Sequence, residues 1–507
     1  MEANKPIYYL QPDVPAKCLF AKDNLTNNPH PVLVRNIEQK IYPDISHCIG
    51  NTPLVKLNHI PKSMGIKCDV LVKCEFLNPG GSIKDRMAHY MIQNAENKGL
   101  LKPGSILIEP TSGNTGIALG MISAIKGYEC ILVFPGKSSN EKEDILKALG
   151  CKVVRCSDKI PYNQPGGIFC RPMEIHKETP NSAILHQFWN PCNPLSHYYG
   201  TAMEIFEQCD GKVDMVAIGV GTGGTATGIG RRFKEMMPEC LIVGVDPIGS
   251  AIAEPASINE TDVIYFEIEG IGHGFHPPTL DKKMIDFWLK VGDKESLNMA
   301  RRMHKEEGIL CGGSSGTILC GALEAAKSLK EGQKCVVILP DGVGNYLTKF
   351  LSDYWMEVRG FIPCTNTFNH WWWDYKVALL KPIVGLAISN TKTCQEALDF
   401  MNERGHNILP VVNSDNNLEG VVTIKDITKA LLNSSVKTTD SVEKVLSDKY
   451  ITVTPTSTLG LLSRVLDNEG IAIVIEEKDN KLNQQVPKLI GVIFATDFLQ
   501  YISENRP

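Results

Sequence analysis

The chain has 507 residues, of which 43% are hydrophobic and 21% are charged, and its formal net charge is −5 at pH 7. This length exceeds what one compact core holds and predicts about three structural units. Because no stripe of lysines and arginines occurs, the composition excludes a general nucleic-acid or membrane-surface binder.

Residues 1–40 are rich in proline, asparagine and charge without a sustained period, so we expect an extended arm. The arm lacks the features of a signal peptide and no apolar stretch of 18 residues follows, which predicts a cytoplasmic protein. The 16 cysteines include no Cys-x-x-Cys pair, as expected of reduced thiols.

Cys18 and His30 could both ligate one haem iron, since thiolate and imidazole are known axial ligands. The alternative is a free thiol and a solvated histidine.

Apolar runs alternate with helical patterns from about residue 48 to 157, which predicts an α/β fold with a mostly parallel sheet. The expected strands are 70–76, 105–109, 131–135 and 152–156, and the expected helices are 82–98, 113–126 and 139–149. A second α/β unit is expected from strands at 215–221, 241–247 and 335–341. Ligands of such folds bind at the carboxyl ends of the strands.

The stretch 78–86, Asn-Pro-Gly-Gly-Ser-Ile-Lys-Asp-Arg, ends one expected strand and begins a helix. Ser82 and Asp85 have the spacing of a capping box. Lys84 then lies in the first helical turn, where the positive end of the helix dipole, with Arg86 close by, favours a neutral amine. A neutral amine is what a Schiff-base lysine needs, although an ordinary solvated lysine would fit the same residues.

Three loops follow expected strands. The loop 109–116 offers hydroxyls, an amide and backbone N–H groups at a helix start, which suits a carboxylate or simply caps the turn. The loop 219–225 has a bare backbone that can approach a phosphate. It also matches G-x-G-x-x-G, with Asp246 ending the next strand, so a dinucleotide site stays open. The third loop, 311–316, brings Ser314 and Ser315 to another helix start.

Residues 361–380 interrupt the pattern with Trp371, Trp372 and Trp373, which are expected to pack in a domain contact. Two similar segments of roughly 60 residues follow, as in a pseudo-twofold pair. The first is expected to form helix 393–404, strands 408–412 and 420–423 and helix 425–432; the second, helix 459–468, strands 471–476 and 490–494 and helix 496–502. Thr423 and Asp426 could hold a ribose, or they could form a capping box.

Together the lysine and the loops resemble the fold-type-II pyridoxal-phosphate enzymes, and nearly the full length is similar to the animal cystathionine β-synthases. This resemblance implies a haem-binding arm at 1–40, a catalytic core at 41–360, a linker at 361–380 and tandem CBS domains at about 381–437 and 438–507. It also implies two cofactors, pyridoxal 5′-phosphate and haem b. Oligomers of one chain and an adenosine-type ligand at the CBS domains are expected as well.

The resemblance assigns roles to particular residues. Lys84 is the expected Schiff-base lysine, Asn114 contacts the phenolic oxygen of the cofactor, and Ser314 contacts its pyridine nitrogen. The expected phosphate-binding residues are Gly221, Thr222, Gly223, Gly224 and Thr225, and the expected substrate-binding residues are Thr111, Ser112, Gly113, Thr115 and Gln187. The haem ligands are Cys18 and His30, with Arg231 beside the thiolate, and the regulatory nucleotide residues are Thr423, Asp426 and Asp497.

Five residues depart from the family pattern. Phe188 and His273 stand where tyrosines are usual, Gly136 and Ser138 replace a glutamate and a methionine, and Phe494 replaces the threonine of the second nucleotide motif. The first four are expected to affect the second substrate and turnover rather than cofactor binding. Phe494 places a ring where a hydroxyl would meet ribose.

The expected reaction is a β-replacement in which L-serine and L-homocysteine give L-cystathionine and water, with hydrogen sulfide production from cysteine as a side activity. A neutral Ser314 hydroxyl would leave the pyridine nitrogen unprotonated, which favours β-chemistry. The alternatives are a cysteine synthase, a serine dehydratase, or a catalytically weakened nucleotide sensor. A dinucleotide dehydrogenase ranks last because no hydride-transfer partner is evident.

Overall fold

The structure is a computed structural model, and it describes residues 41–506 apart from 112, 136–137, 157–159, 161, 264, 433–435, 448–449 and 477–486. The predicted haem ligands Cys18 and His30 lie outside the described residues, as do Ser112 and Gly136.

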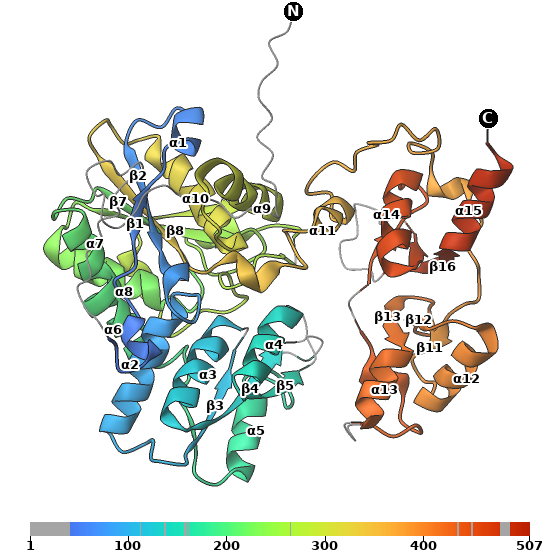
Figure 1. The fold of residues 1–507 in the computed structure, drawn as a ribbon, viewed down its shortest axis with the longest axis horizontal. Helices are drawn as coiled ribbons and strands as arrows, with labels where there is room; N and C mark the ends of the chain where they lie inside the picture. The colour runs from blue at the N-terminus through green and yellow to red at the C-terminus, as the bar shows by residue number, and fades with distance from the viewer. Residues whose placement is uncertain are drawn as a thin grey trace, which may run out of the picture. The chain divides into compact units, whose positions relative to one another are not determined.

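The larger sheet of the core has six strands in the order β1-β2-β10-β7-β8-β9 (Figure 1). Only β1 runs antiparallel to its neighbour, and the other pairs are parallel. The strands are β1 (Leu54–Lys56), β2 (Asp69–Cys74), β7 (Met215–Gly219), β8 (Leu241–Pro247), β9 (Phe287–Val291) and β10 (Lys334–Leu339). The three late strands predicted from the sequence are confirmed in this sheet, whereas β1 and β9 were not predicted.

The smaller sheet has four parallel strands in the order β5-β4-β3-β6. Its strands are β3 (Ile106–Pro110), β4 (Glu129–Pro135), β5 (Lys152–Cys156) and β6 (Ser182–Ile184). Parallel pairing buries both faces of a sheet, which explains the near-continuous apolar runs Ile106–Leu107–Ile108 and Ile131–Leu132–Val133.

Helices cover both sheets of the core (Figure 1). They are α1 (Ile60–Ser63), α2 (Lys84–Asn97), α3 (Asn114–Lys126), α4 (Asn140–Ala148), α5 (Cys170–Glu178), α6 (Cys192–Ser196), α7 (Ala202–Gln208), α8 (Gly224–Met236), α9 (Asp293–Arg302), α10 (Gly313–Ala326) and α11 (Asp353–Val358). Helix α10 is buried along almost its whole length because its residues are small or apolar. It lies against β7, β8, β10 and α9 and so fixes the loop that enters it.

The start of α2 differs from the predicted capping box. The Ser82 hydroxyl accepts the N–H of Lys84 at 3.2 Å, but the Asp85 carboxylate accepts the N–H of Gly80 at 2.6 Å instead of turning back to Ser82. Gly80 lies so close that a Cβ there would be 2.5 Å from Asp85 Oδ1. The capping box is therefore wrong, because the preceding loop folds over the helix start and takes the carboxylate.

Two units of the same topology form the C-terminal region. The first contains β11 (Ile388–Ser389), α12 (Cys394–Arg404), β12 (Ile408–Val412), β13 (Leu418–Thr423) and α13 (Ile424–Leu432). The second contains β14 (Thr452–Val453), α14 (Leu459–Glu469), β15 (Ile471–Ile475), β16 (Leu489–Phe494) and α15 (Ala495–Glu504). Each unit has one parallel and one antiparallel strand pair, with a register shift at the end of its second strand. The predicted internal repeat is confirmed.

The tryptophans of the expected linker pack on the second unit. Trp372 and Trp373 are both 8% exposed and share a core with Leu459 and Leu462 of α14. The Trp373 ring can pack this closely only because residue 460 is a glycine, since a Cβ there would lie 2.4 Å from the ring.

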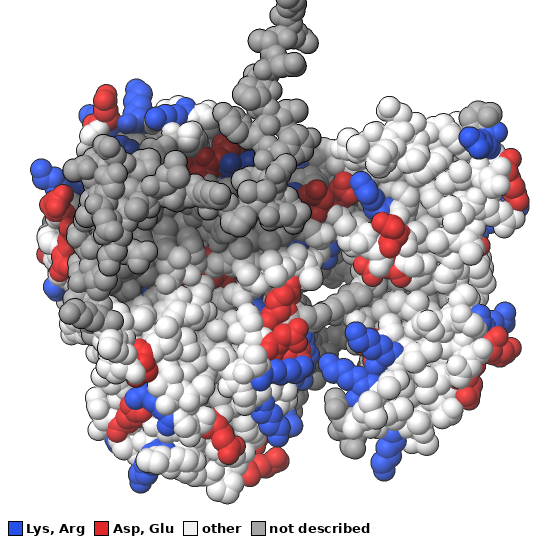
Figure 2. All heavy atoms as spheres, viewed as in Figure 1, with Lys and Arg blue, Asp and Glu red and all other residues white. Residues whose placement is uncertain are grey.

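Charged side chains of both signs are interspersed on the face shown in Figure 2. None of the described helices is both long and apolar enough to cross a membrane.

Candidate active site

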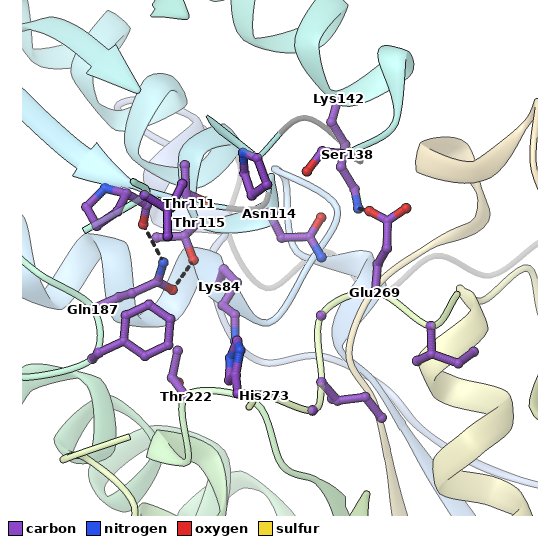
Figure 3. A pocket seen from close by; sticks show the side chains of 18 of the residues that line it. Lys84, Thr111, Asn114, Thr115, Ser138, Lys142, Gln187, Thr222, Glu269 and His273 are labelled. Carbon is purple, nitrogen blue, oxygen red and sulfur yellow. Dashed lines mark hydrogen bonds and ion pairs between the residues drawn. The ribbon is translucent and has the colours of Figure 1, made fainter. Parts of the chain in front are cut away.

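One cavity of about 190 Å³ lies where the loops after β2, β3 and β7 meet. The side chains labelled in Figure 3 line it from helices and loops that follow strands of both sheets. The predicted residues that line it are Lys84, Thr111, Asn114, Thr115, Gln187 and Thr222. The structure therefore joins the predicted lysine to two of the three predicted loops.

Lys84 lines this cavity and also a second, smaller one of about 20 Å³. Burial lowers the pKa of its amine to about 8, against the opposing charge of Asp341. The predicted neutral-tending amine is confirmed in direction, but Arg86 is not its cause. Arg86 is paired with carboxylates instead, so desolvation of Lys84 dominates.

The glycine loop closes the smaller cavity, which Gly221, Thr222, Gly223 and Thr225 line together with Lys84. Gly223 has φ of +87°, and a Cβ at Gly221 would lie 2.5 Å from the carbonyl oxygen of Gly270. Only glycine fits this path. Gly224 begins α8, whose first N–H groups have no partner within the helix and attract an anion. The loop therefore suits the phosphate of the predicted cofactor.

The rival dinucleotide site is not supported. It requires the Asp246 carboxylate to be available for a ribose. Asp246 is fully buried, and its Oδ2 pairs with Lys290 Nζ at 2.7 Å. This aspartate therefore stabilises the end of β8 instead of facing a ligand.

The predicted substrate loop is held by hydrogen bonds within the loop and by hydrogen bonds to Gln187. The Thr111 hydroxyl accepts the N–H groups of Gly113 and Gly116, both at 3.1 Å. The Thr115 hydroxyl donates to Gln187 Oε1 at 2.7 Å, and Gln187 Nε2 donates to the carbonyl of Pro110 at 2.9 Å. Thr115 and Gln187 are thus one unit, facing the cavity from α3 and from the loop after β6 (Figure 3).

Glu109 supports that unit, and sequence reasoning missed this role. Its carboxylate accepts the backbone N–H groups of His186 and Gln187, both at 2.8 Å. Burial raises the pKa of Glu109 to about 7, although these N–H groups favour the ionised form. The position of Glu109 at the end of an expected strand was the sequence feature that could have indicated this role.

Asn114 faces the cavity with both ends of its amide engaged. Its Nδ2 donates to Asp341 Oδ2 at 2.8 Å, and its Oδ1 accepts from Asn345 Nδ2 at 3.0 Å. The predicted contact of Asn114 with the cofactor stays a prediction. Ser314 lies in the first turn of α10, 1% exposed, and is not among the residues that line the two cavities.

A buried ion cluster that the sequence did not reveal forms one wall of the cavity. Lys142 Nζ lies 2.5 Å from Glu269 Oε2, and Lys349 pairs with the other oxygen of the same carboxylate. Burial opposes ionisation of Glu269, but the two lysines keep its pKa below the usual value. The stem of Lys142 passes so close to Gly113 that a Cβ there would lie 2.3 Å from Lys142 Cδ. Lys142 thus packs against the substrate loop at Gly113 while its amine pairs with Glu269 (Figure 3).

An aromatic wall contains two of the five departures from the family pattern, Phe188 and His273. Phe188 meets the ring of His273 edge-on with centroids 5.3 Å apart, and His273 stacks on Phe275 at 5.0 Å. Phe169 closes the group at 5.3 Å from both phenylalanines. The cavity therefore presents ring edges and one imidazole where the resemblance leads one to expect two phenol hydroxyls.

In the C-terminal units the predicted nucleotide residues act as helix caps. The Thr423 hydroxyl donates to Asp426 Oδ2 at 2.6 Å and accepts the N–H of Asp426 at 3.0 Å. Asp497 Oδ2 accepts the N–H of Phe494 at 2.8 Å. The ring of Phe494 lies flat on His406, with centroids 4.4 Å apart and planes within 5°. Phe494 of the second unit thus stacks on His406 of the first unit, and its backbone N–H is held by Asp497.

Arg231, expected beside the haem thiolate, is 53% exposed and pairs with Asp281 at 3.0 Å. Among the described residues, no group of three or more histidine, cysteine, aspartate or glutamate side chains could hold a metal ion.

Residues 45–341 match the family model described as pyridoxal-phosphate dependent enzyme, and residues 381–433 match that of the CBS domain. The chain is 46% identical to a cystathionine beta-synthase of Apis mellifera, over 98% of each chain. It is 42% identical to one of Dictyostelium discoideum, over 98% of this chain and 99% of the relative.

Solved structures resemble the core. A hydrogen sulfide-producing enzyme from Fusobacterium nucleatum gives a TM-score of 0.57 at 34% identity, covering 61% of this chain and all 100% of the other. An O-acetylserine dependent cystathionine beta-synthase from Helicobacter pylori gives 0.56 at 34% identity, over 61% of this chain and 99% of the other.

Proposed function

Because the chain belongs to the cystathionine β-synthase family of pyridoxal-phosphate-dependent enzymes, we propose that it condenses L-serine with L-homocysteine to L-cystathionine and water. The observation that carries this proposal is the position of Lys84, whose amine lies between the glycine loop and the Thr111–Thr115 loop. The Lys84 amine, whose pKa is lowered, thus lies next to a loop that suits a phosphate and a loop that suits a carboxylate.

Pyridoxal phosphate, when bound, supplies an aldehyde that condenses with amines and a ring that accepts the electron pair left at the α-carbon. The glycine loop and the start of α8 would hold its phosphate, and Lys84 would hold its aldehyde end. Once released, the Lys84 amine can take the α-proton of serine, because its pKa of about 8 is close to neutral pH. The N-terminal N–H groups of α3 would bind the substrate carboxylate.

Product analysis tests this function. The purified enzyme, given serine and homocysteine, is expected to form cystathionine, and serine alone should give little product. Pyruvate from serine alone would instead indicate a serine dehydratase. Cysteine formed from an activated serine and sulfide, without cystathionine from homocysteine, would indicate a cysteine synthase. The aromatic wall of Phe188, His273 and Phe275 supports both alternatives, because it lines the cavity with rings where the resemblance implies tyrosine hydroxyls. Hydrogen sulfide release from cysteine is proposed as a side activity.

We also propose that the N-terminal arm binds haem b through Cys18 and His30, with both axial positions filled by protein. The support is the order and spacing of these residues together with a similarity that extends over 98% of the chain. Arg231 would have to exchange Asp281 for the thiolate. A Soret band in the spectrum of the purified protein is the expected result, and its absence after haem-supplemented expression would contradict the proposal.

The remaining proposals concern the whole chain. We propose the domain order arm, core, linker and two CBS domains, a homo-oligomer, and a cytoplasmic location. The shared topology of the two C-terminal units supports a CBS assignment for both.

We propose that an adenosine-type ligand binds the CBS domains at Thr423 and Asp426, and that the corresponding place at Asp497 is blocked. Phe494 is bonded through its backbone N–H to Asp497, its ring stacks on His406, and it offers no hydroxyl for a ribose. The alternative of a weakened core serving as a nucleotide sensor would require tight ligand binding without turnover.

Replacing Phe494 with threonine is expected to strengthen S-adenosylmethionine binding by roughly tenfold, as one restored hydrogen bond to a polar ligand would. Calorimetric titration of the full chain measures this. Phe494→Leu is the matched control, since it removes the ring without adding a hydroxyl. Equal affinities for the threonine and leucine variants would show that the hydroxyl contributes nothing.

A further inference from the structure

His197 is a buried histidine behind the glycine loop that the proposed reaction does not use. It begins a π-helical segment, His197–Thr201, and is 1% exposed. Its Nδ1 lies 2.9 Å from the Thr201 hydroxyl, and its Nε2 lies 3.2 Å from the Thr225 hydroxyl. Thr225 in turn lines the small cavity beside Lys84. His197 is therefore one hydrogen bond away from the place where an anion is expected.

The packing around His197 fixes this geometry. Gly228 of α8 lies against the segment so closely that a Cβ would be 2.2 Å from the carbonyl of Pro194 and 2.8 Å from His197 Cβ. Single π-helical turns are rare and occur often at functional sites. The imidazole at the start of this turn reaches Thr225 in the first turn of α8.

The charge state of His197 follows from its surroundings. Burial lowers its pKa well below the usual range, and the positive charges of Arg86 and Lys84 lower it further, whereas Glu204 opposes them. The imidazole is therefore neutral, with one ring nitrogen that donates and one that accepts.

The two tautomers have opposite consequences for Thr225. If the proton is on Nδ1, that nitrogen donates to Thr201, and Nε2 accepts the proton of Thr225, leaving only lone pairs of Thr225 toward the cavity. If the proton is on Nε2, Thr225 accepts it and its own O–H is free to point into the cavity, while Thr201 donates to Nδ1. An anion in the cavity selects the second arrangement, because it needs a donor.

We propose that His197 is a positioning residue that fixes the Thr225 hydroxyl as a donor to the cofactor phosphate. The chain of bonds runs from Thr201 through the imidazole to Thr225, and from there to the phosphate. This inference rests on the proposed cofactor site. It adds to that site a residue that lies behind the loop and touches neither cofactor nor substrate.

Two variants distinguish the contribution of Nδ1 from that of Nε2. Asparagine places its amide near the Nδ1 position and cannot reach Thr225, whereas the longer glutamine can offer an N–H near the Nε2 position. The full-length apoenzyme is titrated with pyridoxal 5′-phosphate and, separately, with pyridoxal, which lacks the phosphate. His197→Asn is expected to weaken binding of the phosphorylated form by roughly tenfold or more, the usual effect of losing a hydrogen bond to a charged group. Its affinity for pyridoxal should stay that of the parent, and His197→Gln should resemble the parent for both.

The coupling to Thr225 gives the second test. Thr225→Val should weaken binding of the phosphorylated form as much as His197→Asn, and the double variant should be no weaker than Thr225→Val alone. Equal losses for pyridoxal and its phosphate in His197→Asn would overturn the proposal, since the residue would then only support the fold. If His197→Asn does not fold, parental affinity in Thr225→Val would overturn it. A parent chain that binds neither compound would refute the proposed function itself, which is a distinct outcome.

Discussion

Replacing Lys84 with alanine is expected to abolish turnover and to leave the purified protein without the visible absorbance of a lysine-bound cofactor. The change removes the nucleophile that would hold the aldehyde and the base that would take the α-proton. Loss of positioned proton transfer alone predicts a decrease in kcat of ~10²–10⁴-fold, and loss of the covalent link adds to it. Product formation from serine and homocysteine measures the first effect. Borohydride reduction followed by peptide mapping measures the second.

Two further substitutions make this test specific. Lys84→Arg keeps a positive charge but has no amine that can form the covalent link, so it should be as inactive as Lys84→Ala. Lys98, at the exposed end of the same helix, gives the matched control, and Lys98→Ala should behave as the parent. A Lys84→Ala protein that retains turnover, or cofactor fixed by borohydride to another side chain, would remove Lys84 from its assigned role.

The loops of this site were predictable because each is a local pattern. Glycines and hydroxyls that follow an apolar run predict a turn at the carboxyl end of a strand, and parallel strands bring such turns to one edge. The confirmed β3 and β7 place the predicted residues Thr111, Thr115 and Thr222 around the cavity in this way. The identity of the cofactor came from the resemblance rather than from these patterns.

The supports of the site were not predictable because their partners are distant in the sequence. Lys142 and Glu269 are separated by 127 residues, and Lys349 and Glu269 by 80. A lysine on a helix is usually solvated, and no spacing rule marks one whose charge is buried. The capping box was wrong for a different reason, since Asp85 bonds Gly80 only five residues earlier and the fold of that short loop decided its partner.

Arg86 belongs to a buried charge network directly behind Lys84. Its guanidinium bridges Glu75, at 2.6 and 2.8 Å, and Glu204, also at 2.6 and 2.8 Å. Lys73 Nζ pairs with the same Glu204 at 2.7 Å, and Glu75 and Lys73 are fully buried. Two double hydrogen bonds of this kind match the planar geometry of arginine, which lysine cannot reproduce.

Replacing Arg86 with leucine is therefore expected to reduce the free energy of unfolding of the core by about 3–5 kcal/mol, because two carboxylates lose their main counter-charge inside the protein. Urea unfolding, followed by the visible absorbance of the bound cofactor, measures the transition of the core. Lys327→Ala is the control, since the Lys327 and Glu324 side chains are 58% and 61% exposed and an exposed pair contributes only ~0–1 kcal/mol. A loss below about 1 kcal/mol in Arg86→Leu would contradict the expected desolvation cost.

The pH dependence gives an independent check of the same network. Burial alone would raise the pKa of Glu204, but Arg86 and Lys73 lower it to about 2. A carboxyl whose folded pKa lies below its unfolded value of about 4.3 stabilises the protein above that value, and the contribution is lost as the pH falls from there toward the folded pKa. The difference in stability between the parent and Arg86→Leu should thus be full at pH 7 and shrink below about pH 4. A difference that stays constant across this range would mean that Arg86 stabilises the core by its packing rather than by its charge.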